Sequence, residues 1–195
     1  MLIIHHRRNT IDSLKDVDSH LGVEVDIRSF GSKLIINHDP FKESINFEDW
    51  LIHYKHKLLI LNVKVEGLEE PLILLMKKYN IKNFFFLDQS FPFLIKTILI
   101  GEKRTSIRVS EYESIETALK LSGKAEWVWV DFFNYFPLDY KSFLKLKEAR
   151  FKLCLVSPEL QGHSYKKVDH LKNEIKKMQI NFDAVCTKNP NLWNG

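Results

Sequence analysis

Short apolar runs alternate with amphipathic stretches along the whole chain, and this alternation restricts the fold more than any other feature. The runs are rich in Ile, Val, Leu and Phe, and the stretches between them show helical periodicity. Eight runs have this character, at residues 2–5, 22–28, 58–65, 83–87, 105–109, 127–131, 151–156 and 182–186. Helices are expected near residues 10–20, 47–54, 68–79, 92–100, 114–121, 138–149 and 165–178. This strand-then-helix order is typical of an α/β protein with a parallel sheet.

Eight strands joined by helices favour a closed (β/α)8 barrel of the TIM type over an open doubly wound sheet. The chain has 195 residues, whereas such barrels usually have about 250. We therefore expect a compact barrel with short helices and short loops. No Pro- or Gly-rich linker, low-complexity tract or shift in composition divides the sequence, so the prediction is a single domain over residues 1–195.

The composition is that of a folded protein, and the charge pattern does not suit a polyanionic partner. Hydrophobic residues make up 45% of the chain, and the formal net charge is +4. The basic residues form short local pairs and no stripe that could follow a nucleic-acid backbone. We expect no nucleic-acid partner, whereas an anionic small molecule is compatible with the mild positive charge.

Two features indicate the compartment. Cys154 and Cys186 each lie within an apolar run, as expected for buried reduced thiols rather than for a disulfide or a zinc site. The apolar N-terminal segment, residues 1–4, is too short for a signal peptide or a membrane span. The prediction is a cytoplasmic protein without an integral membrane segment, and the sequence leaves its oligomeric state open.

Two acidic residues interrupt the second apolar run. Glu24 and Asp26 alternate with apolar residues, so on a strand their side chains share one face, about 6.6 Å apart along the backbone. Two carboxylates that point into a barrel are costly unless a cation or basic side chains accompany them. Mg²⁺ or Ca²⁺ is the natural occupant, because these ions prefer oxygen ligands. An ion network with Arg28, Lys64 or Arg7 is the alternative.

Histidines flank this acidic pair in the sequence. The first run ends in His5, His6 and Arg7, and an expected hairpin at residues 31–32 leads to His38 and Asp39. Active sites of (β/α)8 barrels lie at the C-terminal ends of the strands, which is where these residues fall. Because His5 alternates with His6, it is expected to point outward into the helix layer.

Acidic residues also follow two later runs. Asp131 ends the sixth run, and Glu159 comes shortly after the seventh. Both positions fit loops that face a substrate, and both fit turns. The sequence leaves their role open.

At the residues around the acidic pair, the sequence resembles the glycerophosphodiester phosphodiesterase family. The family pattern has His-Arg-Gly at the end of the first strand, Glu-Asn-Thr at the first helix, Glu-x-Asp on the second strand and His-Asp after a short hairpin. The matching positions are His6, Arg7, Asn9, Thr10, Glu24, Asp26, His38 and Asp39. The resemblance is specific over residues 1–40 and only architectural beyond them.

The resemblance implies metal-assisted cleavage of a phosphodiester by a (β/α)8 barrel. It implies that His6 and His38 act as general acid and base, that Arg7 binds the phosphate, and that Glu24 and Asp26 hold a divalent metal ion. An unperturbed histidine pKa near 6.5 suits both proton-transfer roles. The expected substrate is a glycerophosphodiester-like small molecule whose alcohols the sequence does not identify.

Departures from the family pattern leave the state of the metal site open. Arg8 replaces the glycine of His-Arg-Gly, and the glutamate of Glu-Asn-Thr has no counterpart. The third strand of the family carries Glu-x-Lys, whose glutamate is a metal ligand, whereas the chain reads Lys64-Val65-Glu66. Glu66 is then the expected third metal ligand, with Lys64 a phosphate-binding residue or a partial substitute for the cation.

The leading prediction is a metal-dependent phosphoric diester hydrolase, and two alternatives remain. A catalytically degenerate barrel would bind a phosphorylated metabolite or a protein partner. A glycoside hydrolase would use Glu24 or Glu66 with Asp26, but the histidine pair and Arg7 favour phosphate. No Gly-rich phosphate loop, Gly-x-Ser-x-Gly elbow or Cys-x-x-Cys pair supports another class.

Overall fold

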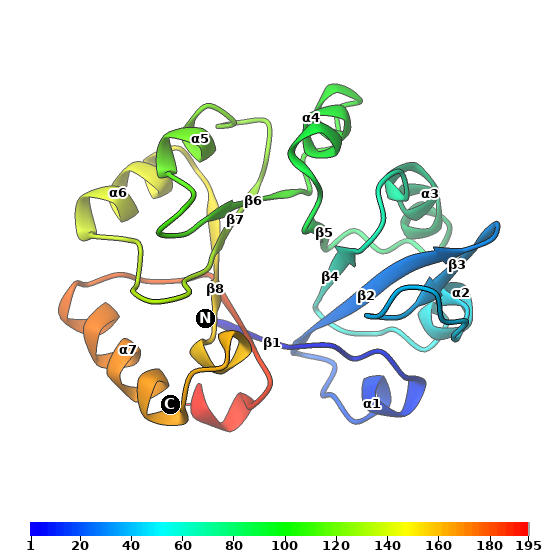
Figure 1. Ribbon diagram of the computed structural model, residues 1–195, viewed down its shortest axis with the longest axis horizontal. Helices are drawn as coiled ribbons and strands as arrows, with labels where there is room; N and C mark the ends of the chain where they lie inside the picture. Colours follow the sequence, from blue (N-terminus) through cyan, green and yellow to red (C-terminus); the bar gives the residue numbers. More distant parts are fainter. Residues whose placement is uncertain (195) are drawn as a thin grey trace.

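The computed structural model describes residues 1–194 and confirms the predicted barrel. Eight parallel strands follow the order β5-β4-β2-β1-β9-β8-β7-β6, and helices surround them (Figure 1). The strands are β1 (Leu2–His5), β2 (Gly22–Phe30), β3 (Lys33–Ile36), β4 (Leu58–Val63), β5 (Phe84–Leu87), β6 (Ser106–Val109), β7 (Trp127–Val130), β8 (Lys152–Val156) and β9 (Ala184–Thr187). All eight predicted strands are therefore present, with bounds that differ by at most two residues.

The helices lie where the periodicity predicts them, and most are shorter. They are α1 (Ile11–Lys15), α2 (Phe47–Leu51), α3 (Glu69–Lys78), α4 (Phe91–Leu99), α5 (Ile115–Leu119), α6 (Tyr140–Glu148) and α7 (Tyr165–Lys177), with 3₁₀ turns η1 (Pro158–Gln161) and η2 (Pro190–Leu192). Thr10 caps α1 through a reciprocal pair of hydrogen bonds with Ser13. Most helices are between one and three turns long, which explains how a chain of this length closes a barrel.

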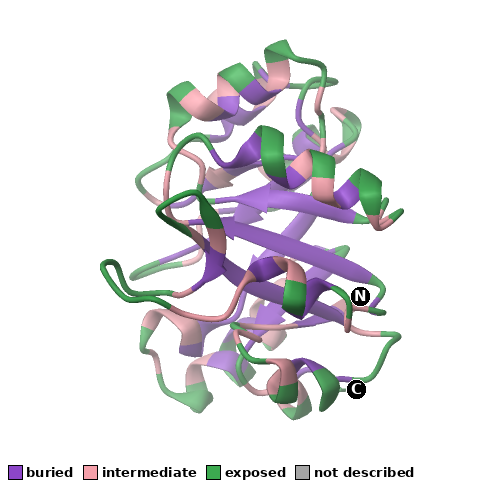
Figure 2. Cartoon of the chain, turned by 90° about the vertical axis from the view of Figure 1, so that its right-hand side faces the viewer, coloured by how far each residue is buried: buried purple, intermediate pink, exposed green. Residues whose placement is uncertain are grey.

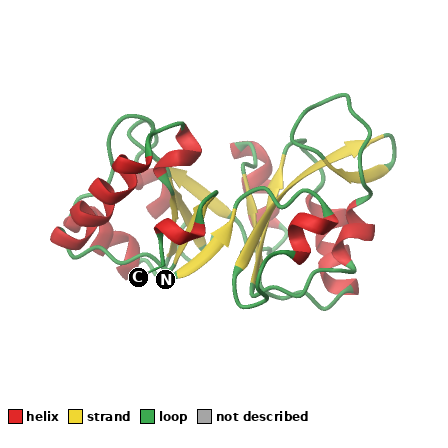
Figure 3. Ribbon diagram, turned by 90° about the horizontal axis from the view of Figure 1, so that it is seen from below, coloured by secondary structure: helices red, strands yellow, loops and turns green. Residues whose placement is uncertain are grey.

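The extra strand β3 forms a hairpin with β2 that projects from the barrel (Figure 3). Gly31 occupies the turn with φ +58°, a left-handed conformation that glycine adopts without a Cβ clash. Antiparallel pairing of Ile36 with Ile27 then returns the chain from the hairpin turn to the level at which β2 pairs with the end of β4. The hairpin therefore places the segment that contains His38 at the face of the barrel where the parallel strands have their C-terminal ends.

The strands alternate between the barrel interior and the helix layer. Figure 2 shows buried strands and helices that are exposed on one side only. Inside the barrel, an aromatic and aliphatic cluster includes Phe85 stacked on Trp127 at 4.6 Å between ring centroids. Gly22 keeps the packing of β1 on β2 tight, because a Cβ there would lie 2.8 Å from Cγ1 of Ile4. The polar residues of β2 come after this apolar layer, towards the strand ends.

The barrel closes most weakly between β5 and β6. One isolated parallel bridge joins Phe86 to Thr105, and Phe86 N–H donates to the carbonyl of Arg104 over 2.9 Å. Side chains complete the seam: Ser106 Oγ donates to the Phe86 carbonyl over 2.8 Å, and Thr105 Oγ1 donates to Gln89. The seam therefore depends on side-chain hydrogen bonds where other strand pairs use a backbone ladder.

Both cysteines are free and buried in the barrel, as the sequence predicts. Burial raises the pKa of the Cys154 and Cys186 thiols, which keeps them protonated and unreactive. Over residues 1–194, no helix has the length and apolar character needed to span a bilayer.

Candidate active site

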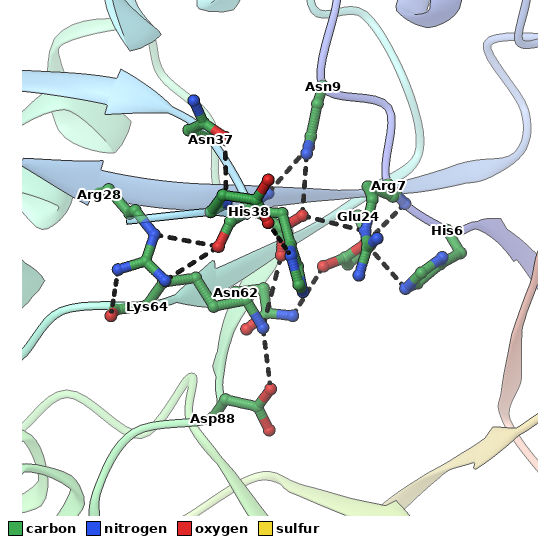
Figure 4. A network of polar contacts seen from close by, with 12 residues as sticks. His6, Arg7, Asn9, Glu24, Arg28, Asn37, His38, Asn62, Lys64 and Asp88 are labelled. Atoms are coloured by element: carbon green, nitrogen blue, oxygen red, sulfur yellow. Dashed lines mark hydrogen bonds and ion pairs between the residues drawn. The ribbon is translucent and has the colours of Figure 1, made fainter. Parts of the chain in front are cut away.

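β2 places the two acidic side chains together inside the barrel, and both are fully buried. Glu24 Oε2 accepts the backbone N–H of Arg7 over 2.6 Å, and Oε1 accepts the side-chain amide of Asn62 over 2.8 Å (Figure 4). Burial, and secondly the negative charge of Asp26, raise the Glu24 pKa above its usual range. Without an added cation, this carboxyl is therefore protonated more readily than an ordinary glutamate.

Basic and amide side chains around the Glu24–Asp26 pair contact Asp26. Its Oδ2 accepts Nδ2 of Asn9 over 2.8 Å and lies 3.2 Å from Nε of Arg7. Its Oδ1 lies 3.4 Å from Nζ of Lys64 and has no hydrogen-bond partner within residues 1–194. Asn9 also accepts the backbone N–H of Asp26 over 3.0 Å, which fixes the first loop against β2.

His6 stands at the end of β1 beside Glu24. Its Nε2 lies 3.8 Å from Glu24 Oε2, which is too long for a hydrogen bond. Burial, and secondly the positive charge of Arg7, lower the His6 pKa to about 3. We therefore describe the pair as a neutral imidazole beside a carboxyl with a raised pKa, and not as an ion pair.

His5 points away from the carboxylates, as the strand alternation predicts. Burial, and secondly the charges of Arg8 and His56, lower the His5 pKa to about 4. Both ring nitrogens are buried without a hydrogen-bond partner in the described chain. His5 therefore belongs to the packing between the barrel and its helix layer.

His38 reaches the mouth of the barrel from the hairpin and is partly exposed, at 45% of its side chain. Arg28 holds its backbone: Nε and Nη2 donate to the His38 carbonyl over 3.1 and 2.9 Å, and Nη1 donates to the Lys64 carbonyl over 3.2 Å. The His38 Nδ1 lies 3.1 Å from Oδ1 of Asp39. In the view of Figure 4, His6 and His38 approach the carboxylates from different sides.

A chain of alternating charges extends from Asp26 along the ends of the next strands. Lys64 Nζ lies 3.2 Å from Oδ2 of Asp88, and Arg108 pairs with Asp88 and, at 3.7 Å, with Asp131. Gln161 from η1 donates to both oxygens of Asp131, at 2.8 and 2.9 Å. Asp131, whose role the sequence leaves open, therefore faces the mouth of the barrel.

A cavity opens beside this chain at the weak β5–β6 seam. It has a volume of about 360 Å³, and Asp88, Ser106 and Arg108 contribute polar groups to its wall. Asp88 has φ +59°, a left-handed conformation that is uncommon outside glycine and often occurs at functional sites. Asp88 and Arg108 were not identified from the sequence, because neither belongs to a recognisable motif. Asp88 directly follows β5, and Arg108 lies within β6.

The structure does not bring Glu66 to the acidic pair. Glu66 is exposed beyond the end of β4, and no hydrogen bond or ion pair joins it to Glu24 or Asp26 within residues 1–194. Asn62 lies there instead, because the β2–β4 register pairs it with Asp26. Asn62-Val63-Lys64 thus occupies the place that the sequence comparison assigned to Lys64-Val65-Glu66.

The donor set fits a hard cation in part. Over residues 1–194, no three His, Cys, Asp or Glu side chains form a metal-binding cluster. Two acceptor oxygens beside Glu24 are nevertheless buried without a hydrogen-bond donor, Oδ1 of Asp26 and Oδ1 of Asn62. Buried acceptors usually have a donor or a cation as partner. Two carboxylates and one amide are oxygen ligands of the kind that Mg²⁺ and Ca²⁺ prefer.

Comparison with solved structures finds this architecture in two bacterial enzymes. A glycerophosphodiester phosphodiesterase from Agrobacterium tumefaciens str. C58 superposes with a TM-score of 0.67 at 12% identity, covering 98% of this chain and 97% of that chain. A glycerophosphoryl diester phosphodiesterase from Parabacteroides distasonis ATCC 8503 superposes with a TM-score of 0.69 at 13% identity, covering 98% of this chain and 84% of that chain. No family model matches the sequence, and no curated protein matches it either. The chain therefore has the barrel fold of the glycerophosphodiester phosphodiesterases, in a form that has diverged far in sequence.

Proposed function

We propose that the protein is a phosphodiesterase that hydrolyses a glycerophosphodiester-like small molecule. The proposal rests on the group of side chains at the barrel mouth. Glu24 and Asp26 are buried together there, and Arg7 and Lys64 each lie close to Asp26 as cations. His6 lies beside Glu24. These residue types suit an anionic phosphate better than a neutral sugar, because a guanidinium and an ammonium complement phosphate oxygens. The fold shared with two phosphodiesterases supports the same reaction class.

A divalent metal ion is part of the proposal. Glu24, Asp26 and Asn62 would hold it, since their oxygens line the same part of the inner wall. When bound, such an ion polarises a phosphoryl oxygen and neutralises charge that develops on it. Lys64 brings a positive charge to Asp26 Oδ1 at 3.4 Å, so it either complements the metal ion or competes with it.

The protein's own side chains would divide the proton transfers between them. His6 is a neutral imidazole whose Nδ1 is buried without a partner. It would take a proton from a nucleophilic hydroxyl or water once the negative charge of a bound phosphate has raised its lowered pKa. His38 is partly exposed, and its Nδ1 lies 3.1 Å from Asp39 Oδ1. As an imidazolium beside this carboxylate, it would donate its Nε2 proton to the leaving alcohol. Arg7, whose backbone N–H binds Glu24 and whose side chain binds Asp26, would orient the phosphate between the two rings.

The test is hydrolysis of bis(p-nitrophenyl) phosphate and of glycerophosphodiesters, with Mg²⁺, Mn²⁺, Ca²⁺ or EDTA. Loss of His6 or of the Glu24 charge removes a proton-transfer group or a metal ligand, so His6→Ala and Glu24→Gln should each lower kcat/KM by on the order of 10²-fold or more. His170→Gln and Glu148→Gln, exposed on α7 and α6, are matched controls and should retain full activity.

Three outcomes would separate the proposal from its alternatives. Metal-dependent turnover that both variants lose supports it. Equal turnover in wild type and variants contradicts the assigned site. Absence of turnover with every metal, together with stabilisation by inorganic phosphate, would favour the non-catalytic barrel that binds a phosphorylated metabolite.

A further inference from the structure

Lys188 follows the last barrel strand directly and lies beside His6. β9 ends at Thr187, which pairs with His5 in the parallel register, and the His6 N–H donates to the Thr187 carbonyl over 2.9 Å. Burial and Arg7 have the largest effects on the His6 pKa, and the charge of Lys188 lowers it further. The β1–β9 pairing therefore places Lys188 next to His6 at the ends of these two strands.

A buried polar cluster fixes the backbone at Lys188. Glu159 accepts the hydroxyls of Ser157 and Thr187 and, over 3.1 Å, the backbone N–H of Lys188. Trp193 donates its indole N–H to Ser157 Oγ over 2.7 Å. All four side chains of the cluster are buried, so their hydrogen bonds lie in a poorly solvated setting and hold the chain in one direction. Glu159, whose role the sequence leaves open, thus acts on the site through Lys188.

Lys188 is a cation at the mouth without an acidic partner. Arg7 lies 3.2 Å from Asp26, and Lys64 lies 3.2 Å from Asp88. By contrast, Lys188 is exposed and its ammonium makes no ion pair or side-chain hydrogen bond within residues 1–194. Its charge is therefore available to an external anion.

The strand order separates Lys188 from Lys64 and from the acidic pair, to which the Arg7 side chain is bound. Lys64 follows β4, the acidic pair lies on β2, His6 follows β1 and Lys188 follows β9, in that order around the barrel. Neighbouring strands are about 4.8 Å apart, so three strand spacings separate the start of the Lys64 side chain from that of Lys188. A phosphate held near Arg7 and Lys64 leaves Lys188 to meet another part of the substrate.

We propose that Lys188 is a specificity-determining residue that binds an anionic group, a carboxylate or a phosphate, on the alcohol at the β9 side of the phosphodiester. The inference rests on the proposed function and narrows its substrate class to phosphodiesters of acidic alcohols. Such an alcohol would bring an anion for the unpaired ammonium, whose backbone is held next to His6 by the Glu159 hydrogen bond.

The experiment compares three diesters: glycerophosphoglycerol, the diester in which glycerate replaces one glycerol, and glycerophosphoglycerol with a terminal phosphate. Wild type should favour the two acidic diesters by about tenfold in kcat/KM, mainly through KM, because a charge-assisted hydrogen bond forms only with them. Lys188→Met should reduce this ratio to about one, and Lys188→Arg should restore it. Lys177→Met, which removes an exposed lysine in the last turn of α7, should leave the ratio unchanged.

A binding measurement keeps this inference separate from the proposed function. Thermal stabilisation by 3-phosphoglycerate should exceed that by glycerol 3-phosphate in wild type and not in Lys188→Met. If no diester is hydrolysed but this difference appears, the phosphodiesterase proposal fails while the anion site stands. Equal stabilisation by the two ligands, or an unchanged substrate ratio in Lys188→Met, would overturn the role of Lys188. A preference for only one acidic diester would identify the anion as carboxylate or as phosphate.

Discussion

The side-chain amide of Asn62 donates a 2.8 Å hydrogen bond to Oε1 of Glu24, so a neutral residue sits against a carboxylate that has no acidic neighbour on β4. The amide oxygen of Asn62 is buried and has no donor in the described chain. A third carboxylate at this point would bind a divalent cation more tightly than an amide, because carboxylates contribute charge as well as an oxygen. For the proposed metal ion, an amide in place of a carboxylate at position 62 should therefore lower the affinity.

Asn62→Asp should raise the affinity for Mg²⁺ by roughly tenfold, which corresponds to about 1.4 kcal/mol of extra stabilisation when the metal is in excess. In EDTA the same variant should be less stable than wild type, because a third buried carboxylate joins Glu24 and Asp26 without an additional counter-charge. Thermal unfolding with a series of Mg²⁺ concentrations measures both effects without any assay of activity.

Asn37→Asp is the matched control for this change, since Asn37 lies at the end of the hairpin and its side chain accepts the Asp39 N–H. Its Mg²⁺ dependence should equal that of wild type. If Asn62→Asp responds to Mg²⁺ no more than Asn37→Asp does, the assignment of Asn62 to a metal site is wrong.

The stability of the protein should fall as the pH is lowered from about 6.5 to about 4, in part because of His5. Its pKa is lowered from 6.5 to about 4, first by burial and then by Arg8 and His56. In this window the unfolded chain binds a proton that the folded chain does not, so stability is present above pH 6.5 and is lost as the pH falls. His5→Gln should reduce this loss, measured as the change of the urea midpoint between pH 7 and pH 4.5.

His170→Gln provides the comparison for the pH series, because His170 is exposed on α7. That variant should show the same acid sensitivity as wild type. His6 contributes to the same trend, with a pKa lowered to about 3, so His5→Gln should remove only a part of it. An acid sensitivity unchanged in His5→Gln would contradict the role of buried His5.

Strand periodicity alone predicted the barrel, because eight apolar runs and seven amphipathic stretches leave few other topologies. The same alternation correctly put Glu24 and Asp26 on one face and His5 on the other. The lengths of the helices were overestimated where polar residues continue a helical pattern, as at residues 16–20 after α1. Periodicity describes which face is apolar, and it does not mark where a short helix ends.

The contacts between strands could not be read from the sequence. Whether position 62 or position 66 faces Asp26 depends on the β2–β4 register, which pairs Asp26 with Asn62. The Asp88–Arg108 contact depends on closure between β5 and β6. Lys188 gains its place beside His6 through β9–β1 pairing, across nearly the whole length of the chain. Each of these relationships depends on a long-range register. Local alternation gives the face on which a residue lies, and it does not say which residue of the neighbouring strand lies opposite.

The β5–β6 seam should be the part of the barrel that opens first. Ser106 Oγ donates to the Phe86 carbonyl over 2.8 Å in a buried setting, and its loss in Ser106→Ala should cost about 1 kcal/mol of stability. Hydrogen exchange should be faster for the amides of β5 and β6 than for those of β1 and β2, and the variant should widen the difference. Equal protection of all eight barrel strands would show that the side-chain bonds close the seam as firmly as a backbone ladder.

Arg28 should determine the position of His38, because its guanidinium binds the carbonyls of His38 and Lys64 at once. Arg28→Met removes three hydrogen bonds and leaves the apolar part of the side chain, so the segment after β3 should become mobile. We expect kcat to fall by about tenfold or more, and cleavage by trypsin at Lys42 to become faster. Lys33→Met, at the start of the exposed hairpin strand, should change neither quantity. A drop in kcat without faster cleavage would mean that Arg28 contacts the substrate directly, and no change in either would mean that His38 keeps its place without Arg28.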